Sequence, residues 1–506
     1  MKKILEKRDF IKILNKLRLN KKRIVLCHGV FDIVHYGHIL HFKSAKQLGD
    51  VLIVSITRDK FIKKGIGRPI FNEIQRLKYL SEIEIIDYLY ICETDSAADS
   101  IKIIKPSYYV KGPDYKNNLL DSTKKIFLEK RLVEKFKGRI IYTNDEKFSS
   151  SVIINEKNLL ALNNDQESYI KNIKNKFNYN YIKTQILNFK KLKTLLIGEL
   201  IFDHYCFGNI IGKSGKEPHL VLKEINNEFY VGGTGAVARH LSSFVHSVQI
   251  ISPFGDEDFF KKILKKTFNK NIIENFLKPE EKYSSIVKKR FIDQVSNYKM
   301  FGSYILPHKP SKKFSQILIS KIKTRLKNSD MIIICDYGHD FLDKKSASFI
   351  SKLKKFKALN AQLNSANIGY HSVNHYKNID ALVINEAELR QELREEKLNI
   401  EILAQTLIKR NKIKNLIVTR GKNGAMLFRK DLNVVSCPAF ASQSVDKVGA
   451  GDAMLSISAL AIKQNLEPEL VLFLGSIAAA ISVKTIGNKI SVDINELDKI
   501  IQYMLK

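Results

Sequence analysis

Short apolar runs alternate with amphipathic segments between residues 23 and 151, which is typical of strands separated by helices. The apolar runs predict strands at residues 23–27, 50–57, 88–91, 108–111 and 139–142. The segments between them predict helices at residues 38–48, 72–83 and 96–104, and a Lys-rich helix that ends at residue 137. Since short apolar strands joined by helices form parallel sheets with right-handed crossovers, this pattern predicts a parallel α/β domain.

A second α/β series begins near residue 194. Its apolar runs predict strands at residues 194–197, 247–251, 331–335, 381–384 and 415–419. Residues 217–230 and 284–304 instead alternate polar and apolar positions, which favours antiparallel strands and a small β-lid. The fold class predicted for the chain is therefore α/β, with two Rossmann-like parallel-sheet domains.

The change in composition between the two series indicates a connector. Residues 160–191 are rich in Asn, Lys and Tyr and contain no Gly or Pro. We expect a first domain at residues 1–158, a polar helical connector at 159–192 and a second domain at 193–506. Five apolar residues at helical spacing also predict an N-terminal helix that packs against the first domain. They are Ile4, Leu5, Ile11, Leu14 and Leu17.

The composition of the 506 residues is that of a folded protein, with 44% hydrophobic and 27% charged residues. The 85 Lys and Arg against 52 Asp and Glu give a formal charge of +33, which can indicate a nucleic-acid partner. The lysines are dispersed through every helix-like segment and accompany many Ile and Asn residues, as an A-rich codon bias would produce. We therefore expect no nucleic-acid partner, although an anionic substrate would still be attracted.

Cysteine usage and the terminal segment suggest a cytoplasmic location. The five cysteines form no CxxC pair, and their odd number disfavours a disulfide framework. The basic N-terminus lacks the continuous apolar region of a secretory signal. Residues 470–483 form the longest apolar stretch, which is too short to span a bilayer, so no membrane insertion is expected.

The first candidate site lies between a predicted strand and a predicted helix, in the segment Gly29-Val-Phe-Asp-Ile-Val-His-Tyr-Gly-His38. The three-residue spacing of His35 and His38 places both imidazoles on one side of a helical turn. Gly37 lets a phosphate approach the backbone, and the helix start offers free N–H groups. Such donors stabilise charge when an α-phosphate is attacked and pyrophosphate leaves. A zinc site that includes His28 and His41, or a group of ordinary surface histidines, are the alternatives.

These residues resemble the cytidylyltransferase-like nucleotidyltransferases, a family that includes the adenylyltransferase half of the bifunctional heptose-phosphate enzymes. The resemblance covers most of residues 23–155 and extends to Leu48-Gly-Asp50, Gly67-Arg-Pro69, Gln75-Arg76 and Val110-Lys-Gly-Pro-Asp-Tyr115. It implies that His35 and His38 are catalytic. It also implies nucleotide-binding roles for Gly29, Phe31, Asp32, Gly37, Lys46, Arg76, Lys111, Asp114, Ser149, Ser150 and Ser151. The serine run alone is equally explained by a helix N-cap.

The second candidate site is the segment Asp446-Lys-Val-Gly-Ala-Gly-Asp452, which precedes a predicted helix at residues 453–463. Backbone N–H groups around Gly449 and Gly451 can point at a transferring phosphoryl group, and Asp452 is placed to take a proton from an attacking hydroxyl. An Asp N-cap on a Gly turn is the structural alternative. Two upstream segments make the catalytic interpretation the better one. They are Thr419-Arg-Gly-Lys-Asn-Gly424 and Asn385-Glu-Ala-Glu388.

Together these segments resemble the ribokinase (PfkB-type) carbohydrate kinases over about residues 194–495, including Gly198-Glu-Leu-Ile-Phe-Asp203, Phe254-Gly-Asp256 and Asp336-Tyr-Gly-His339. The resemblance implies that Asp452 is the catalytic base and that Mg²⁺ and ATP are required. Implied ATP and anion-hole residues are Thr419, Gly421, Gly424, Gly449, Ala450 and Gly451. Implied sugar-binding residues are Asp203, Gly232, Gly233 and Arg290, and Asn385 and Glu388 would hold Mg²⁺ through water.

The chain departs from the heptose enzymes in three ways. Ala236 stands where the heptose kinase usually has Asn, Lys447 replaces a small polar residue, and the kinase region comes second rather than first. We therefore expect a bifunctional enzyme of nucleotide-sugar precursor synthesis, of the ADP-heptose type. It would use ATP or CTP as nucleotidyl donor and a sugar phosphate as acceptor, as a homo-oligomer. The alternative is a CTP-dependent cytidylyltransferase whose kinase-like region senses sugar or acts as a scaffold, and a basic nucleic-acid-binding protein is the third hypothesis.

Overall fold

The computed structural model divides into two compact units, Met1–Ala161 and Leu162–Lys506. The structure describes residues 3–5, 7–62, 69–112, 125–143, 162–217, 219–294, 298–362, 367, 371–430, 434–441 and 446–505. The helices α7 (Asn164–Lys176) and α8 (Tyr179–Asn188) fall in the segment expected to connect the domains. They belong to the second unit, where the Tyr169 hydroxyl donates to the Glu469 carbonyl (2.8 Å) and the Tyr179 hydroxyl donates to Asp498 (2.8 Å).

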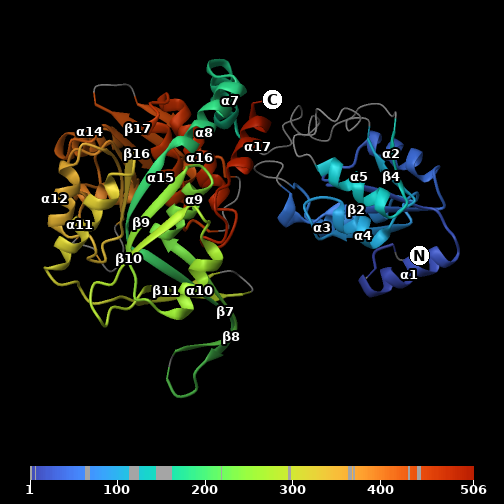
Figure 1. Cartoon of the computed structure of the whole chain (residues 1–506), viewed down its shortest axis with the longest axis horizontal. Coiled ribbons are helices and arrows are strands. Elements are labelled where there is room, and N and C mark those ends of the chain that lie inside the picture. Colours follow the sequence, from blue (N-terminus) through green and yellow to red (C-terminus); the bar gives the residue numbers. More distant parts are fainter. Residues whose placement is uncertain are drawn as a thin grey trace. The chain divides into compact units, whose positions relative to one another are not determined.

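The first unit is built on a five-stranded parallel sheet with the order β3-β2-β1-β4-β5. Its strands are β1 (Ile24–Gly29), β2 (Val51–Thr57), β3 (Tyr88–Cys92), β4 (Tyr108–Lys111) and β5 (Arg139–Tyr142). Its helices are α1 (Lys7–Leu19), α2 (Tyr36–Lys46), α3 (Glu73–Ser81), α4 (Ala98–Ile104) and α5 (Lys125–Lys135), with a short 3₁₀ helix η1 (Asp59–Phe61). The predicted parallel α/β fold is therefore confirmed for this unit (Figure 1).

Both faces of this sheet are covered, as the alternation of side chains along β1 requires. Leu26 packs in a cluster with Phe10 and Leu14 of α1. Val25 faces the other cluster, which contains Phe42 of α2 and other buried residues of the opposite face. The N-terminal helix therefore does pack on the first unit.

The second unit contains a nine-stranded sheet with the order β10-β9-β6-β13-β14-β15-β16-β17-β18. Its strands are β6 (Lys193–Gly198), β9 (Ser247–Pro253), β10 (Ile272–Leu277), β13 (Met331–Asp336), β14 (Phe356–Ala361), β15 (Ala381–Asn385), β16 (Asn415–Thr419), β17 (Ala425–Arg429) and β18 (Val435–Cys437). The strands from β10 to β16 are parallel, and the last two are antiparallel.

Helices surround this sheet in Figure 1. They include α9 (Thr234–Ser242), α10 (Asp258–Thr267), α11 (Phe314–Leu326), α12 (Lys344–Lys352), α13 (Glu386–Leu393), α14 (Ile400–Asn411), α15 (Ala450–Lys463), α16 (Pro468–Ser482) and α17 (Ile494–Met504). Short 3₁₀ helices are η4 (Phe189–Lys191), η5 (Val373–His375) and η6 (Gly421–Asn423). The apolar stretch at residues 470–483 forms most of α16, and no described helix is long and apolar enough to cross a membrane.

The predicted lid is a four-stranded sheet, but it is mixed rather than antiparallel. Its strands are β7 (Leu200–Lys213), β8 (Leu220–Gly233), β11 (Ile286–Asp293) and β12 (Lys299–Ile305). The outer pairs are antiparallel, whereas β7 and β11 run parallel. Alternation along one strand shows that one face is exposed but does not reveal the direction of its neighbour. In Figure 1 the β7–β8 hairpin extends away from the nine-stranded sheet.

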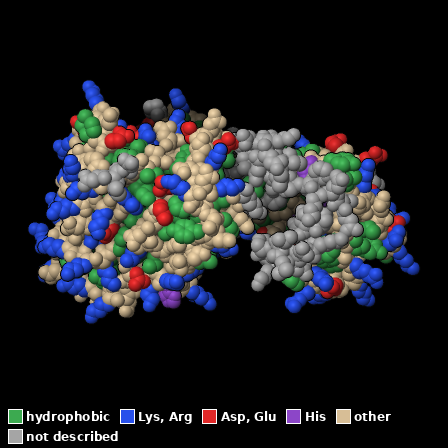
Figure 2. Space-filling view, turned by 90° about the horizontal axis from the view of Figure 1, so that it is seen from above, with side chains coloured by type: hydrophobic (Ala, Val, Ile, Leu, Met, Phe, Trp, Pro, Cys, Tyr) green, Lys and Arg blue, Asp and Glu red, His purple; other side chains and the backbone are tan. Residues whose placement is uncertain are grey.

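Lysine and arginine side chains are scattered over the face shown in Figure 2, between apolar and uncharged side chains. This distribution agrees with the dispersed lysines of the sequence and does not form the continuous basic stripe that suits a nucleic-acid backbone. All five cysteines are buried and free.

Candidate active sites

The first candidate site lies at the carboxyl edge of the five-stranded sheet, where β1 passes into α2. The neighbours β1 and β4 mark the point at which the strand order reverses, which is where open α/β sheets bind ligands. His35 directly precedes α2, and the His35 and His38 ring centroids are 4.0 Å apart. The structure thus brings the two predicted catalytic histidines together at a helix N-terminus.

Hydrogen bonding defines which nitrogen of His38 faces a ligand. The backbone N–H of His35 donates to Nδ1 of His38 (3.4 Å), which leaves the proton of a neutral His38 ring on Nε2. Burial lowers the pKa of His35, so this ring is neutral at pH 7. A neutral His35 ring can donate to a phosphate oxygen but cannot add a full positive charge.

Phe31 and Asp32 shape the loop between β1 and α2. Phe31 has a φ of 50° and packs its ring against Gly29, where a Cβ would lie 3.0 Å from the ring. Asp32 Oδ1 accepts hydrogen bonds from the backbone N–H groups of Ile70 (2.8 Å) and Phe71 (3.0 Å). These contacts give the Gly-x-Phe-Asp pattern a structural role, because they fix the loop that carries the histidines.

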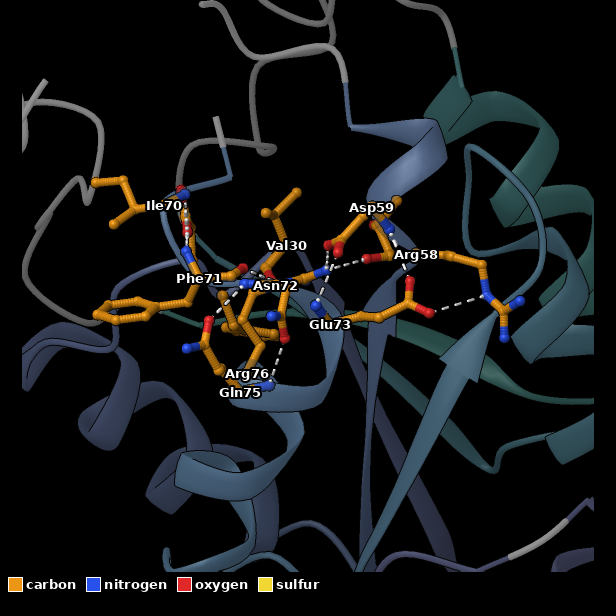
Figure 3. Close-up of polar contacts among 12 residues, drawn as sticks. Val30, Arg58, Asp59, Ile70, Phe71, Asn72, Glu73, Gln75 and Arg76 are labelled. Atoms are coloured by element: carbon orange, nitrogen blue, oxygen red, sulfur yellow. Dashed lines mark hydrogen bonds and ion pairs between the residues drawn. The ribbon is translucent and has the colours of Figure 1, made fainter. Parts of the chain in front are cut away.

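Arg76 is fully buried and holds neighbouring segments together (Figure 3). Its guanidinium donates to the carbonyls of Phe71 (3.1 Å), Val30 (2.6 Å) and Thr57 (2.8 Å), and pairs with Asp59 (2.6 Å). This geometry does not provide the predicted contact between Arg76 and a nucleotide phosphate. Arg76 instead fastens the loop before α2 to the segment after β2.

Lys46 does not join the histidines. It ends α2, and the ten residue steps of this helix, at about 1.5 Å each, separate its two ends by about 15 Å. Its ammonium pairs with Asp87 and donates to the Asp50 carbonyl (2.9 Å). The sequence placed Lys46 on the correct helix but at the wrong end for a phosphate contact.

Lys111 ends β4 at the same sheet edge as the histidines, and it is paired with a residue that the sequence analysis missed. Its ammonium lies 3.1 Å from Glu129 on α5. Burial acts to raise the pKa of Glu129, but Lys111, the Ala97 N–H and His28 together hold it below its ordinary value. Glu129 is one of two carboxylates in a Lys-rich helix, and nothing in the sequence favoured it over Glu134. Asp114, Ser149, Ser150 and Ser151 lie outside the described residues.

The second candidate site lies at the N-terminus of α15. Asp452 is in the first turn, and Gly449 caps the helix with a φ of 88°. A Cβ at Gly449 would collide with Asn488, whereas a Cβ at Gly451 would meet nothing within 4 Å. The helix start thus has open space beside Gly451, which suits an anion, while the Ala450 N–H donates to the Lys447 carbonyl (3.4 Å).

Asp452 has the ionisation expected of a base that works near neutral pH. Burial raises its pKa to about 7, and a nearby Asp203 also raises it. The Tyr337 hydroxyl donates to Asp452 Oδ1 (2.9 Å) and opposes that shift. Tyr337 stood within the Asp336-Tyr-Gly-His339 motif, but its role was not predicted.

Two buried carboxylates fix the segment that carries Tyr337. Glu199 accepts hydrogen bonds from the backbone N–H groups of Tyr337 (2.9 Å) and His339 (3.1 Å). Asp336 accepts from the Tyr376 hydroxyl (2.6 Å) and the Gly338 N–H (3.1 Å). Burial raises the pKa of both carboxyls, and their proximity adds to the effect at Glu199. Their hydrogen bonds keep the Tyr337 hydroxyl aimed at Asp452.

The lid sheet assembles the residues expected to face the sugar. Arg290 of β11 pairs with Asp203 of β7 (2.5 Å). A Cβ at Gly232 of β8 would collide with the Asp203 carboxylate, so only glycine fits there. Lys288, two residues before Arg290, is also buried, and burial lowers its pKa while Asp203 opposes the shift. Lys288 could have been predicted as a site residue, because residues two apart on a strand point to the same face and Arg290 was already expected to face the sugar.

The residues expected to hold Mg²⁺ and ATP lie at adjacent strand ends. Asn385 ends β15 beside Thr419, which ends β16. Asn385 Oδ1 accepts from the Glu388 N–H (2.8 Å), and Glu388 Oε2 accepts from the Asn385 N–H (3.1 Å). Gly421 has open space beside it, but Gly424, with a φ of 81°, is required because a Cβ there would collide with the Cys437 carbonyl.

Comparison with known families identifies the larger unit. Residues 191–495 match the model of the pfkB family carbohydrate kinases. The chain belongs to the pfkB family. Residues 26–157 match the model described as Cytidylyltransferase-like, so this pfkB-family chain also carries a nucleotidyltransferase-like region.

The curated relatives match a limited part of their length. The chain is 37% identical over 151 residues to the Bifunctional protein HldE of Campylobacter jejuni serotype O:6, strain 81116. It is 37% identical over 147 residues to the Bifunctional protein HldE of Helicobacter acinonychis, strain Sheeba. The matches cover 27% and 28% of this chain and 32% and 29% of the relatives. The chain thus spans about a third of the length of these curated relatives.

Solved structures support the fold of the pfkB region. The chain aligns with phosphofructokinase-2 from Escherichia coli in complex with potassium, with a TM-score of 0.51 and 17% identity. The alignment covers 63% of this chain and 100% of that structure. At this identity the likeness demonstrates a shared fold alone.

Proposed function

We propose that the chain is a bifunctional enzyme that phosphorylates a sugar or sugar phosphate with ATP and transfers a nucleoside monophosphate to a sugar phosphate. The observation that carries the proposal is the half-buried Asp452 at the glycine-flanked N-terminus of α15, with the Tyr337 hydroxyl on its carboxylate. The paired histidines before α2 support the second activity.

In the kinase reaction, Asp452 takes the proton of a sugar hydroxyl while that oxygen attacks the γ-phosphorus of ATP and ADP leaves. A carboxylate with a pKa of about 7 is ionised in a large fraction of molecules at neutral pH and still binds a proton well. The backbone N–H groups at Gly449, Ala450 and Gly451 stabilise the transferring phosphoryl group.

Asn385 and Glu388 fit a hydrated magnesium ion by their chemistry. Their amide and carboxylate oxygens accept backbone hydrogen bonds from each other, and oxygen acceptors of this kind suit metal-bound water. Magnesium bound there would neutralise phosphate charge on ATP. Thr419 and Gly421 would lie along the nucleotide.

In the transferase reaction, an oxygen of the sugar phosphate attacks the α-phosphorus of a nucleoside triphosphate and pyrophosphate leaves. His35 and His38 donate hydrogen bonds to the phosphate oxygens whose charge grows, and the N-terminus of α2 adds backbone donors. The histidines contact phosphates rather than the base, so they suit ATP and CTP equally.

We propose substrates of the heptose class, which would give a product of the ADP-heptose type. The identity of 37% to a Bifunctional protein HldE over 151 residues supports it. Ala236 and the exposed Lys447 favour the alternative, in which the pfkB region senses sugar without strong turnover. The intact Asp452 and Gly449 favour the kinase.

Phosphorus NMR of the purified full chain tests the proposal. The samples contain Mg²⁺, ATP or CTP, and a panel of sugars and sugar phosphates that includes heptoses. We expect ADP from the kinase and pyrophosphate from one nucleotide–sugar phosphate pair. Pyrophosphate without ADP would support the sensor alternative, and silence of both products across the panel would contradict the proposed enzyme.

A further inference from the structure

A basic cavity of about 900 Å³ lies at the amino edge of the nine-stranded sheet. It is bounded by the starts of β14, β15 and β16, the end of β17, and the C-terminal ends of α12, α14 and α15. Its lining residues are Leu353, Lys354, Lys357, Asn378, Asp380, Ile408, Lys409, Lys412, Ile413, Lys414, Asn415, Arg429, Lys430, Ile462 and Asn465.

This cavity is distinct from the kinase site. Asp380 and Asn415 stand at the beginnings of β15 and β16, whereas Asn385 and Thr419 end the same strands. The four residue steps from Asn415 to Thr419, at about 3.3 Å each, separate the two edges by roughly 13 Å. A ligand in the cavity would therefore occupy a second site, on the opposite edge of the sheet.

The lining is strongly cationic. Seven of its side chains are Lys or Arg, and Asp380 is its one carboxylate. Asp380 is already engaged, because it pairs with Lys414 (2.8 Å) and accepts from the Lys357 N–H (2.9 Å). The general abundance of lysine does not explain this group, since Lys and Arg make up 85 of 506 residues in the chain but nearly half of the lining.

The negative C-terminal ends of helices compensate only a part of the positive charge of the lining. Three helices end here, and each C-terminus is equivalent to about half a negative charge. Asp380 pairs with Lys414, Arg429 also interacts with Glu469, and Lys430 has a partner, but the helix ends do not balance the remaining four cations. Lys357 is 4% exposed, and burial lowers the pKa of its ammonium; Asp380 opposes this shift, while Lys414 adds to it. The cavity thus retains positive charge that a bound anion would stabilise.

Its size and composition indicate the ligand. A volume of about 900 Å³ is within the range of small-molecule pockets and far exceeds the space that a single phosphate needs. The lining also contains the apolar side chains of Ile408, Ile413 and Ile462. Asn378 and Asn465 supply amide groups. We propose that this cavity binds a small organic anion with two or more phosphate groups, of the size of a nucleotide.

Calorimetric titration of the full chain with ADP, and separately with inorganic tripolyphosphate, tests this site. The test variant is Lys409→Glu with Lys412→Glu, since both side chains are exposed in the lining. The matched control is Lys265→Glu with Lys266→Glu, two exposed lysines in the last turn of α10. Lys409→Gln with Lys412→Gln repeats the test with a smaller change of charge.

We expect wild type and control to bind one more ADP per chain than the test variant, whose affinity at this site falls on the order of tenfold or more. The unfolding temperatures should be unchanged. Tripolyphosphate binding that is likewise weakened by the substitutions at Lys409 and Lys412 would support the site. It would also show that a phosphate chain without a nucleoside is enough for binding. Equal stoichiometry in all variants would overturn the proposal, as would equal losses in test and control variants. If only the binding of a single-stranded oligonucleotide depended on Lys409 and Lys412, the proposal would be overturned in favour of a nucleic-acid surface.

Discussion

The two candidate active sites share a plan but differ in the group at their centre. Each lies at the carboxyl edge of a parallel sheet, where a glycine-containing loop leads into a helix N-terminus. His35 and His38 occupy this position in the first unit, and burial keeps the His35 ring neutral. Asp452 occupies it in the second unit, and burial raises its pKa to about 7.

The difference follows from the nucleophile that each proposed reaction uses. A sugar hydroxyl must lose its proton on attack, so the kinase site requires a base whose pKa is near the working pH. A phosphate monoester has a second pKa of about 6 and is already deprotonated at pH 7. The transferase site therefore needs hydrogen-bond donors and no base. Under the proposed function, the same edge of similar sheets would thus serve one reaction that needs a base and one that does not.

The substitution Asp452→Asn tests this contrast most severely. It keeps the shape of the side chain but removes the group that accepts a proton, so phosphorylation should fall by about 10²–10⁴-fold. Pyrophosphate release should be unchanged, which makes it the internal control. Both products can be measured by phosphorus NMR in one sample. An unaltered phosphorylation rate would exclude Asp452 as the base.

The substitution His38→Ala is the counterpart in the first unit. It removes one donor to the phosphate oxygens, and pyrophosphate release should fall by about 10²–10³-fold. Phosphorylation should continue at the wild-type rate. A parallel loss of both activities would contradict the presence of two separate sites.

Arg76→Ala asks whether Arg76 supports the histidine loop or contacts phosphate. Because its donors are occupied by carbonyls and Asp59, the substitution should destabilise the first unit by about 3 kcal/mol. The measurement is the urea concentration at which transferase activity is lost, with kinase activity as the reference. Arg58→Ala, which affects a partly exposed ion pair, should cost at most about 1 kcal/mol. Weaker nucleotide binding with unchanged urea resistance would restore the phosphate role.

Tyr337→Phe should have the smallest effect and a distinctive pH dependence. The Tyr337 hydroxyl lowers the pKa of Asp452, so its loss should raise that pKa further above the ordinary carboxyl value. Since Asp452 must be ionised to accept a proton, the acidic limb of the kcat profile should move to higher pH. We expect a loss of about three- to tenfold at pH 7 that largely disappears at pH 9. A uniform loss at every pH would indicate a purely structural role.

The strands of both units were predictable because buried parallel strands are continuous apolar runs. β4, β5 and β16 begin and end at the predicted residues. The strands β7, β10, β14, β17 and β18 were not predicted. β14 contains Lys357 and Asn360, and their burial depends on partners elsewhere in the fold. The mixed order of the lid was also unpredictable, because alternation is the same in both strand directions.

The sequence by itself determined the two-region α/β organisation, the histidine pair and the glycine-flanked Asp452. These features depend on local spacing, which the chain fixes before it folds. Only the tertiary structure paired Lys46 with Asp87 and Lys111 with Glu129, and placed the Tyr337 hydroxyl on Asp452. It also gathered the cations of the basic cavity from chain segments that are far apart in sequence. Burial and ionisation arise from contacts between distant segments, so the chemistry of each site was decided by packing.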